Sequence, residues 1–334
     1  MIETDKRPAQ FSILNPQSSP QNRLTTAPIR PLVVPLWLGA ERPGVEAGAA
    51  TLARQLVARW DRPDRAALTG RLREPVLIPA PVPADVHVRL GQGWGTFREE
   101  IMATNAALAN GVRHASAAGE LAVALGGDHA LAIGSLAGAA SSAERLGVLW
   151  IDTHPDLNTP ETSPSGHLHG MPLSAALGAG PADLTAVYGD APVVHGADVC
   201  LLGIRDIDPG EGRLIAERGI WTLTMEEWTD RGILPGLGDA LAHLAARGVD
   251  AVHVSFDLDV LDPTVLAGTG TRYPGGLTMR EASQLLRHLG AWDGPIRSLD
   301  WVELNPTLDP TGTSEDVATQ LLATALGERM RPSL

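Results

Sequence analysis

Cysteine is nearly absent from this sequence, since Cys200 is the one cysteine among 334 residues. A single thiol cannot form an intramolecular disulfide or a cage of thiolate metal ligands. Because Cys200 lies in the apolar run Val199–Leu202, we interpret it as a buried and inert side chain. Disulfide stabilisation and thiolate-bound metal are therefore excluded within this chain.

Long apolar runs and a targeting signal are also lacking. No apolar run reaches the roughly 20 residues that a membrane-spanning helix needs. The first ten residues, MIETDKRPAQ, do not have the basic start and apolar centre of a signal peptide. We therefore expect no membrane partner and a cytoplasmic location.

Positive charge is scarce, with 26 Lys and Arg against 39 Asp and Glu and a net charge of −13. No basic patch interrupts this excess, so a polyanion such as nucleic acid would be repelled. The charge balance excludes nucleic acid as a partner and favours a small cationic molecule.

What remains is the composition of a folded protein, with 44% hydrophobic and 19% charged residues. Residues Met1–Arg30 are rich in Pro, Gln, Ser and Thr and have no apolar periodicity, so we expect a mobile tail there. From Pro31 to Leu334 no linker and no internal repeat divides the chain. This pattern predicts a single domain over residues 31–334.

Short apolar runs alternate with longer helical patterns through this domain. Continuous apolar runs are typical of strands that are buried on both faces. The expected strands are Pro31–Trp37, Pro75–Ala80, Leu121–Gly127, Leu146–Asp152, Val199–Ile204, Ala251–Asp257 and Ile296–Glu303. The expected helices include Phe97–Gly119, Leu237–Arg247, Thr278–Leu289 and Ser314–Arg329. Alternation of strands and helices predicts an α/β fold with a central parallel sheet covered by helices.

Polar residues gather directly after these strands. The segments are Gly126–His129, Asp152–Asp156, Asp257–Asp259 and Glu303. The loops at the carboxyl ends of parallel strands share one edge of the sheet, which is where ligands bind. Taken singly, each Asp reads as a helix cap and each His as an ordinary polar residue. Together, the four segments are expected to converge.

The convergence places four carboxylates beside two imidazoles. The carboxylates are Asp152, Asp156, Asp257 and Asp259, and the imidazoles are His129 and His154. Like charges so close together repel unless cations neutralise them. Two divalent ions balance four carboxylates, and a pair of ions about 3.5 Å apart lowers the pKa of a shared water towards neutrality. The donor set suits Mn²⁺, while Zn²⁺, Co²⁺, Ni²⁺ or Fe²⁺ stay open.

These motifs resemble the arginase (ureohydrolase) family from about Pro31 to Arg329. The matching segments, in the order of the family, are GGDHA (126–130), DTHPDLNT (152–159), SFDLDVLDP (255–263), GTGTRYPGGLTMRE (268–281) and WVELNP (301–306). The resemblance implies a three-layer α/β/α fold, two Mn²⁺ per subunit and a homotrimer or homohexamer. It also implies that His129, Asp152, Asp156 and Asp257 surround one ion, and Asp152, His154, Asp257 and Asp259 the other.

The resemblance extends to the loops that read the substrate. It implies that Asn158 and Ser165 bind an α-carboxylate, and that Asp208, with Glu211 behind it, binds an α-ammonium. His167 stands where arginases usually carry Asn. Either an imidazolium at this position adds a charged contact to the carboxylate, or a neutral ring donates one hydrogen bond as the amide does. Ordinary polar turns are the plain alternative for both loops.

Hydrolysis of the guanidino group of L-arginine to urea and L-ornithine is the function that the resemblance implies. We expect Glu303 to pair with the guanidinium, Thr271 to line its pocket, and Asp259 to take the proton of the attacking hydroxide. His169 is expected either to shuttle protons or simply to contact the substrate. The alternatives are a ureohydrolase that acts on a guanidino acid, agmatine or N-hydroxyarginine, and a catalytically silent metal-loaded protein that binds a cationic ligand.

Overall fold

The centre of the protein is an eight-stranded sheet whose strand pairs are all parallel. This computed structural model describes residues 22–185, 187, 189 and 192–329. The strand order is β2-β1-β3-β8-β7-β4-β5-β6. The strands are β1 (Ile29–Val34), β2 (Val76–Leu77), β3 (Leu121–Gly126), β4 (Leu146–Ile151), β5 (Val199–Ile204), β6 (Trp221–Thr224), β7 (Ala251–Asp257) and β8 (Ile296–Val302).

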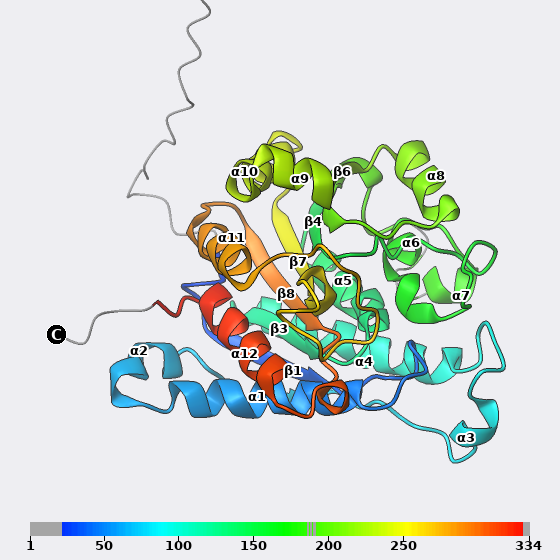
Figure 1. The fold of residues 1–334 in the computed structure, drawn as a ribbon, viewed down its shortest axis with the longest axis horizontal. Helices are drawn as coiled ribbons and strands as arrows, with labels where there is room; N and C mark the ends of the chain where they lie inside the picture. The colour runs from blue at the N-terminus through cyan, green and yellow to red at the C-terminus, as the bar shows by residue number, and fades with distance from the viewer. Residues whose placement is uncertain (1–21, 186, 188, 190–191, 330–334) are drawn as a thin grey trace, which may run out of the picture.

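Helices cover both faces of this sheet and complete three layers. Figure 1 shows α1, α10, α11 and α12 on one side and α4, α5 and α6 on the other. The helices are α1 (Val45–Trp60), α2 (Ala66–Thr69), α3 (Val86–Arg89), α4 (Arg98–Ala117), α5 (Ala132–Ala140), α6 (Pro172–Ala176), α7 (Ala182–Thr185), α8 (Pro209–Arg218), α9 (Met225–Arg231), α10 (Ile233–Ala246), α11 (Met279–Ala291) and α12 (Thr313–Ala325). The three-layer α/β/α fold is confirmed.

Each face of the sheet has its own apolar core. In α1, for example, Leu52 and Leu56 are buried against the sheet, four residues apart on one side of the helix. The second core joins α4 and α5 to the opposite face, where Leu108 and Leu136 are fully buried. No helix in the described part of the chain is long and apolar enough to cross a membrane.

The outer strands differ from what the sequence led us to expect. The run Pro75–Ala80 is not buried on both faces: β2 covers only Val76 and Leu77, which are 40% and 67% exposed. It is an edge strand, so half of its surface has no neighbour to bury it. At the opposite edge, β6 is half-buried, and its mixed polarity hid it from a search for continuous apolar runs. The central strands β5 and β7 have the expected bounds.

The mobile tail expected over Met1–Arg30 includes residues that the structure shows to be packed. Within Met1–Arg30, residues from Asn22 onward are described and packed: Leu24 is fully buried, and the Asn22 amide donates to the carbonyls of Leu289 and Trp292. Strand β1 already begins at Ile29. The polar composition of this stretch concealed a few side chains that dock on α11 and its end. Residues 1–21 lie outside the described part of the chain.

Close packing of α1 gives a first testable prediction. A Cβ on Gly48 would lie 2.0 Å from the backbone oxygen of Leu304, and a backbone atom there cannot move aside. Although alanine favours a helix over glycine, the clash outweighs this gain, so Gly48→Ala should lower the free energy of unfolding by about 1–2 kcal/mol. Gly70→Ala is the control, because its nearest contact is 3.4 Å. Denaturant unfolding measures both, and equal stability of the two variants would contradict the packing argument.

Candidate metal centre and substrate pocket

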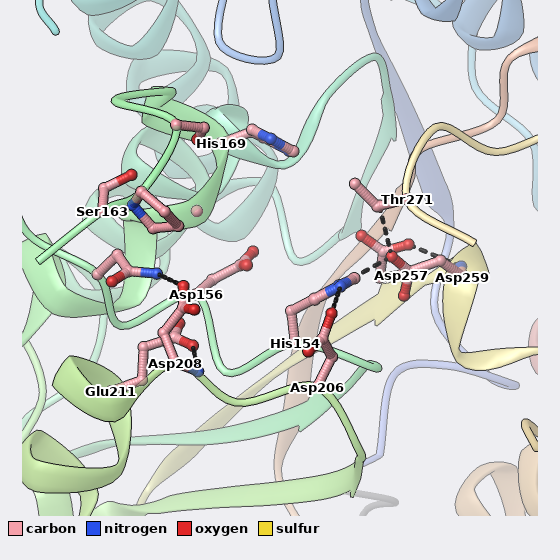
Figure 2. Close-up of a pocket in the computed structure, with 14 residues that line it drawn as sticks. His154, Asp156, Ser163, His169, Asp206, Asp208, Glu211, Asp257, Asp259 and Thr271 are labelled. Carbon is pink, nitrogen blue, oxygen red and sulfur yellow. Dashed lines mark hydrogen bonds and ion pairs between the residues drawn. The ribbon is translucent and has the colours of Figure 1, made fainter. Parts of the chain in front are cut away.

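Loops from the carboxyl ends of β3, β4, β5, β7 and β8 meet at one edge of the sheet, as the sequence predicts. Those after β4, β5 and β7 line a hollow of about 140 Å³. Figure 2 shows Asp208 and Glu211 on one side of this hollow and His154, Asp257, Asp259 and Thr271 on the other. Residues far apart in sequence thus share one pocket because their strands are neighbours in the sheet.

The first donor cluster surrounds His129, at the end of β3. Its Nδ1 lies 3.2 Å from an oxygen of Asp152, 3.0 Å from one of Asp156 and 3.1 Å from one of Asp257. Among the described residues, this buried Nδ1 has no hydrogen-bond partner despite the three oxygens near it. One nitrogen and three oxygens that converge without a hydrogen bond are suited to a shared cation.

The second donor cluster shares Asp152 with the first. Asp152, His154 and Asp259 each present an atom within 4.8 Å of the others'. His154 Nδ1 lies 3.0 Å from an oxygen of Asp259, and 3.7 Å from one of Asp152. All six expected ligands are therefore brought together, in two groups joined by Asp152. Asp257, which was expected to serve both ions, falls in the first of these groups.

The clustered carboxylates repel one another, and bound cations would relieve this repulsion. Burial, reinforced by Asp259 and Asp152, raises the pKa of Asp257 well above its ordinary value. Burial and Asp152 raise the pKa of Asp156 to about 6. Burial disfavours a charged His129, yet its carboxylate neighbours reverse this and raise its pKa. Hard oxygens with borderline imidazole nitrogens are a donor set for a divalent transition metal, so the residues fit such an ion.

Three further side chains support the site and were not assigned from the sequence. Trp150 stacks on the His129 ring at 4.3 Å and donates from its indole to Asp152. Ser255 lies 2.7 Å from the other His129 nitrogen. Trp150 and Asp152 are two residues apart on β4 and its end, and Ser255 precedes Asp257 by two on β7. The two-residue repeat of a strand places such pairs on one face, and that signal could have found them.

Asp128, the third of these side chains, was missed although it stands in the GGDHA segment. Its carboxylate accepts hydrogen bonds from the backbone N–H groups of Gly39, Ala40 and Ala130. Burial and the charge of Glu303 raise the pKa of Asp128 to about 6. Asp128 thus fixes the loop after β1 against the pocket.

The two loops expected to read a substrate head group are tied to each other. The Asn158 amide donates to Asp208 at 2.8 Å. The carboxylate of buried Glu211 accepts from the backbone N–H of Asp208 and from that of Leu157. Because both Glu211 oxygens are engaged in this way, its geometry supports positioning of Asp208 and Asn158 more than contact with a ligand. Ser165 also lines the hollow.

Glu303 lies in a second, smaller hollow of about 80 Å³, which shares His169 and Thr271 with the first. Its carboxylate accepts from the His129 backbone at 2.9 Å and lies 3.4 Å from His169 Nδ1. His167 lines this smaller hollow, not the larger one that holds Asn158 and Ser165. His167 thus differs from Asn158 and Ser165 in the hollow that it lines, although its backbone N–H donates to the Ser165 hydroxyl.

Backbone strain marks the same edge of the sheet. Among the described residues other than glycine, Asp156, Glu303 and Glu41 have positive φ, at 51°, 68° and 50°. Such conformations cost about 1–3 kcal/mol each and persist where the surroundings enforce them, often at functional sites. Two of the three are residues that the motifs had singled out.

Comparison with known proteins agrees with this arrangement. The model of the Arginase family matches residues 32–327. An arginase of Brevibacillus brevis is 36% identical over 298 residues, which cover 89% of this chain and 97% of that protein. The chain belongs to the arginase family. An arginase of Bacillus caldovelox is 44% identical over 194 residues, or 58% of this chain and 64% of that protein.

Solved structures of family members share the fold as well. The native structure of the Bacillus caldovelox arginase at pH 5.6 superposes with a TM-score of 0.83 at 37% identity, covering 92% of this chain and all of that one. The arginase family relationship, and with it the class of an arginase-like amidinohydrolase, are confirmed. Members of this family depend on metal, in agreement with the donor clusters.

The crowded carboxylates generate a prediction about stability. A divalent ion that binds the folded state alone stabilises it by about 4 kcal/mol at a thousandfold excess over its dissociation constant. Removal of metal with a chelator should therefore lower the midpoint of thermal unfolding by several degrees, and added Mn²⁺ should restore it. Asp257→Asn should abolish this response, whereas Asp293→Asn, on the surface, should retain it. An unfolding midpoint indifferent to chelator and metal contradicts the metal site.

Proposed function

We propose that this protein hydrolyses the guanidino group of L-arginine to urea and L-ornithine at a binuclear metal centre. The observation that carries the proposal is the composition of the larger hollow. It offers the carboxylate of Asp208, bonded to the amide of Asn158, and the hydroxyl of Ser165. It also offers the carboxylate clusters. Side chains suited to bind an amino acid head group and a centre suited to hydrolysis thus lie in one pocket.

The six clustered ligands are those we propose for two ions. His129, Asp152, Asp156 and Asp257 would hold one, and Asp152, His154, Asp259 and a shared Asp257 the other, with Mn²⁺ favoured by the donor set. When bound, such ions supply Lewis acidity and lower the pKa of water to near neutrality. The charge of the ligands supports two ions, because four carboxylates balance two divalent cations. Metal analysis that finds one ion or fewer in fully active protein contradicts it.

Glu303 is proposed to orient the guanidinium group. Burial disfavours its charge, but His169 and the backbone N–H of His129 outweigh this and keep the pKa of Glu303 below its ordinary value. The side chain is therefore an anion at neutral pH. A buried carboxylate attracts a planar cation and fixes its orientation through paired hydrogen bonds.

His169 and Asp259 are proposed to move protons. Burial disfavours a charged His169, but Glu303, Asp156 and Asp128 together raise its pKa, so it can hold a proton for the departing amine. Asp259 accepts a hydrogen bond from the Thr271 hydroxyl at 2.8 Å. Burial, with Asp152 adding to it, raises the pKa of Asp259, which makes its carboxylate a better proton acceptor. Thr271 thereby orients Asp259, and it lines both hollows.

One alternative function retains the hydrolysis of a guanidino group, and the other has no catalysis. A guanidino acid, agmatine or N-hydroxyarginine would use the same centre with a different head-group end. A silent metal-loaded protein that binds a cationic ligand has no need of Glu303, His169 and all six donors in these positions. The homotrimer or homohexamer and the cytoplasmic location stay predictions; sedimentation of the protein in solution tests the first.

The substrate is tested by urea release from a panel of guanidino compounds after loading with Mn²⁺. We expect L-arginine to be cleaved with the highest kcat/KM. Ser165→Ala removes a donor to the carboxylate and should raise KM for arginine about tenfold, while KM for agmatine, which has no carboxylate, stays unchanged. Ser142→Ala, at an exposed position outside the hollow, is the matched control. Equal effects on both substrates would remove Ser165 from carboxylate recognition.

Glu303→Gln tests how the guanidinium is held. The amide oxygen can still accept from the His129 N–H, but the negative charge is lost, so kcat/KM should fall roughly ten- to a hundredfold. The stabilisation of the variant by Mn²⁺ should match that of the wild type. Glu217→Gln, an exposed change, controls for loss of charge alone. If Glu303→Gln also loses the metal response, Glu303 is a ligand rather than a substrate contact.

The pH dependence of KM decides between the two forms of His167. Burial, followed by the charge of His169, lowers the pKa of His167 from its ordinary value of 6.5. A group with a lowered pKa has already lost its proton at neutral pH, which favours the neutral alternative. KM for arginine should therefore not rise between about pH 7 and pH 9 because of His167, and His167→Asn should leave the trend unchanged. A rise that His167→Asn flattens would restore the imidazolium.

A further inference from the structure

The smaller hollow adjoins the larger one, since His169 and Thr271 line both. Its floor is Glu303 and Asn305, which are 3% and 1% exposed, and its rim is the exposed side chain of Arg42. At about 80 Å³ it exceeds the roughly 10–15 Å³ that a single water molecule requires. The hollow therefore joins a buried carboxylate and an exposed arginine side chain in one cavity.

Specific bonds hold its walls in place. Asp128 accepts from the backbone N–H groups of Gly39 and Ala40, and the carbonyl of Gly39 accepts from the backbone N–H of His169. At the rim, Arg42 Nη1 donates to the carbonyl of Gly270 at 2.6 Å and joins the loop after β1 to the loop that carries Thr271.

Glu41, next to Arg42, is the third of the strained residues. With φ at 50°, it is held by a hydrogen bond from the backbone N–H of Gly91 to its carboxylate. The same strain at Asp156 and Glu303 accompanies residues that face the reacting groups. Strain at Glu41 indicates that the course of the rim is imposed by the surrounding structure.

The two hollows hold the two parts of the substrate that the reaction separates. This step rests on the proposed function, in which Asn158, Ser165 and Asp208 hold the amino acid head in the larger hollow. Glu303, which orients the guanidinium, lies in the smaller hollow, which His169 and Thr271 share with the larger one. Cleavage of the bond between the guanidino carbon and the side-chain nitrogen leaves the amino acid in the larger hollow and urea beside Glu303 in the smaller one.

We propose that the smaller hollow is a binding site for the urea product, through which urea leaves past Arg42 while the amino acid product is still bound. Urea is planar and offers N–H groups to the Glu303 carboxylate, as the guanidinium does. It carries no charge, so its hydrogen bonds to Glu303 are weaker than those of the cation it replaces. Urea binds there and departs, while an arginine side chain stays.

Two consequences distinguish this route from a single entrance. With one entrance, urea at Glu303 is trapped until the amino acid has left, and the two products exclude each other or leave in a fixed order. With two hollows, both products bind at once and each dissociates by itself. A side chain that fills the smaller hollow weakens urea binding alone.

Ala40→Leu fills the hollow, because Ala40 lines it and the added carbons extend from its wall. Ala47→Leu is the matched control, an equal enlargement at an exposed position on α1. With the Mn²⁺-loaded enzyme, inhibition by urea and ornithine together should show that both bind at once. Ala40→Leu should raise the inhibition constant of urea about tenfold or more and leave that of ornithine unchanged. Ala47→Leu should alter neither, and equal unfolding midpoints show that both variants fold.

Crystals soaked in urea supply a second measurement that does not depend on turnover. Urea should occupy the smaller hollow in crystals of the Mn²⁺-loaded wild type and Ala47→Leu, and be absent from it in Ala40→Leu. Mutual exclusion of urea and ornithine, or an unchanged urea constant in Ala40→Leu, overturns the proposal. If no guanidino compound yields urea, the proposed function fails instead, and the soaked crystals still decide whether this hollow binds urea.

Discussion

Repulsion among buried carboxylates is the constraint on which the rest of the site depends. Asp152, Asp156, Asp257 and Asp259 are all nearly inaccessible to solvent, so water does little to screen them. A parallel sheet brings them together because β4 and β7 are neighbours and end at the same edge. The energy gained from hydrophobic packing on both faces of the sheet holds this unfavourable cluster in place until cations are bound.

The ligands, in turn, need support that does not add negative charge. Trp150 and Ser255 meet this need, since an indole donates to Asp152 and a hydroxyl pairs with His129. Their positions result from strand geometry, in which alternate residues face the same side. Partners of this kind fix the orientation of each ligand before a metal arrives, so little order remains to be imposed on binding.

Central strands can be predicted from the sequence far better than edge strands and loops. Val199–Ile204 and Ala251–Asp257 were found because central strands are continuous apolar runs. The edge strand β2 and the packed stretch from Asn22 are not continuous buried apolar runs. β2 is exposed, and Asn22 is held by a residue far away in the sequence, Leu289. His167 illustrates the same limit: its neighbours in sequence line the larger hollow, but the backbone turn directs its ring to the other one.

The division between strands and loops also separates chemistry from selectivity. Every proposed metal ligand lies within five residues of the carboxyl end of β3, β4 or β7, where the sheet fixes it. The head-group residues Asn158, Ser165 and Asp208 lie on loops, which hydrogen bonds such as that from Asn158 to Asp208 join to one another. Loops change without disturbing the sheet, so a different head group can be accepted while the metal centre is retained. The same division holds at the smaller hollow. Asp128, which follows β3, fixes the loop after β1 there, and Arg42 of that loop donates to the carbonyl of Gly270.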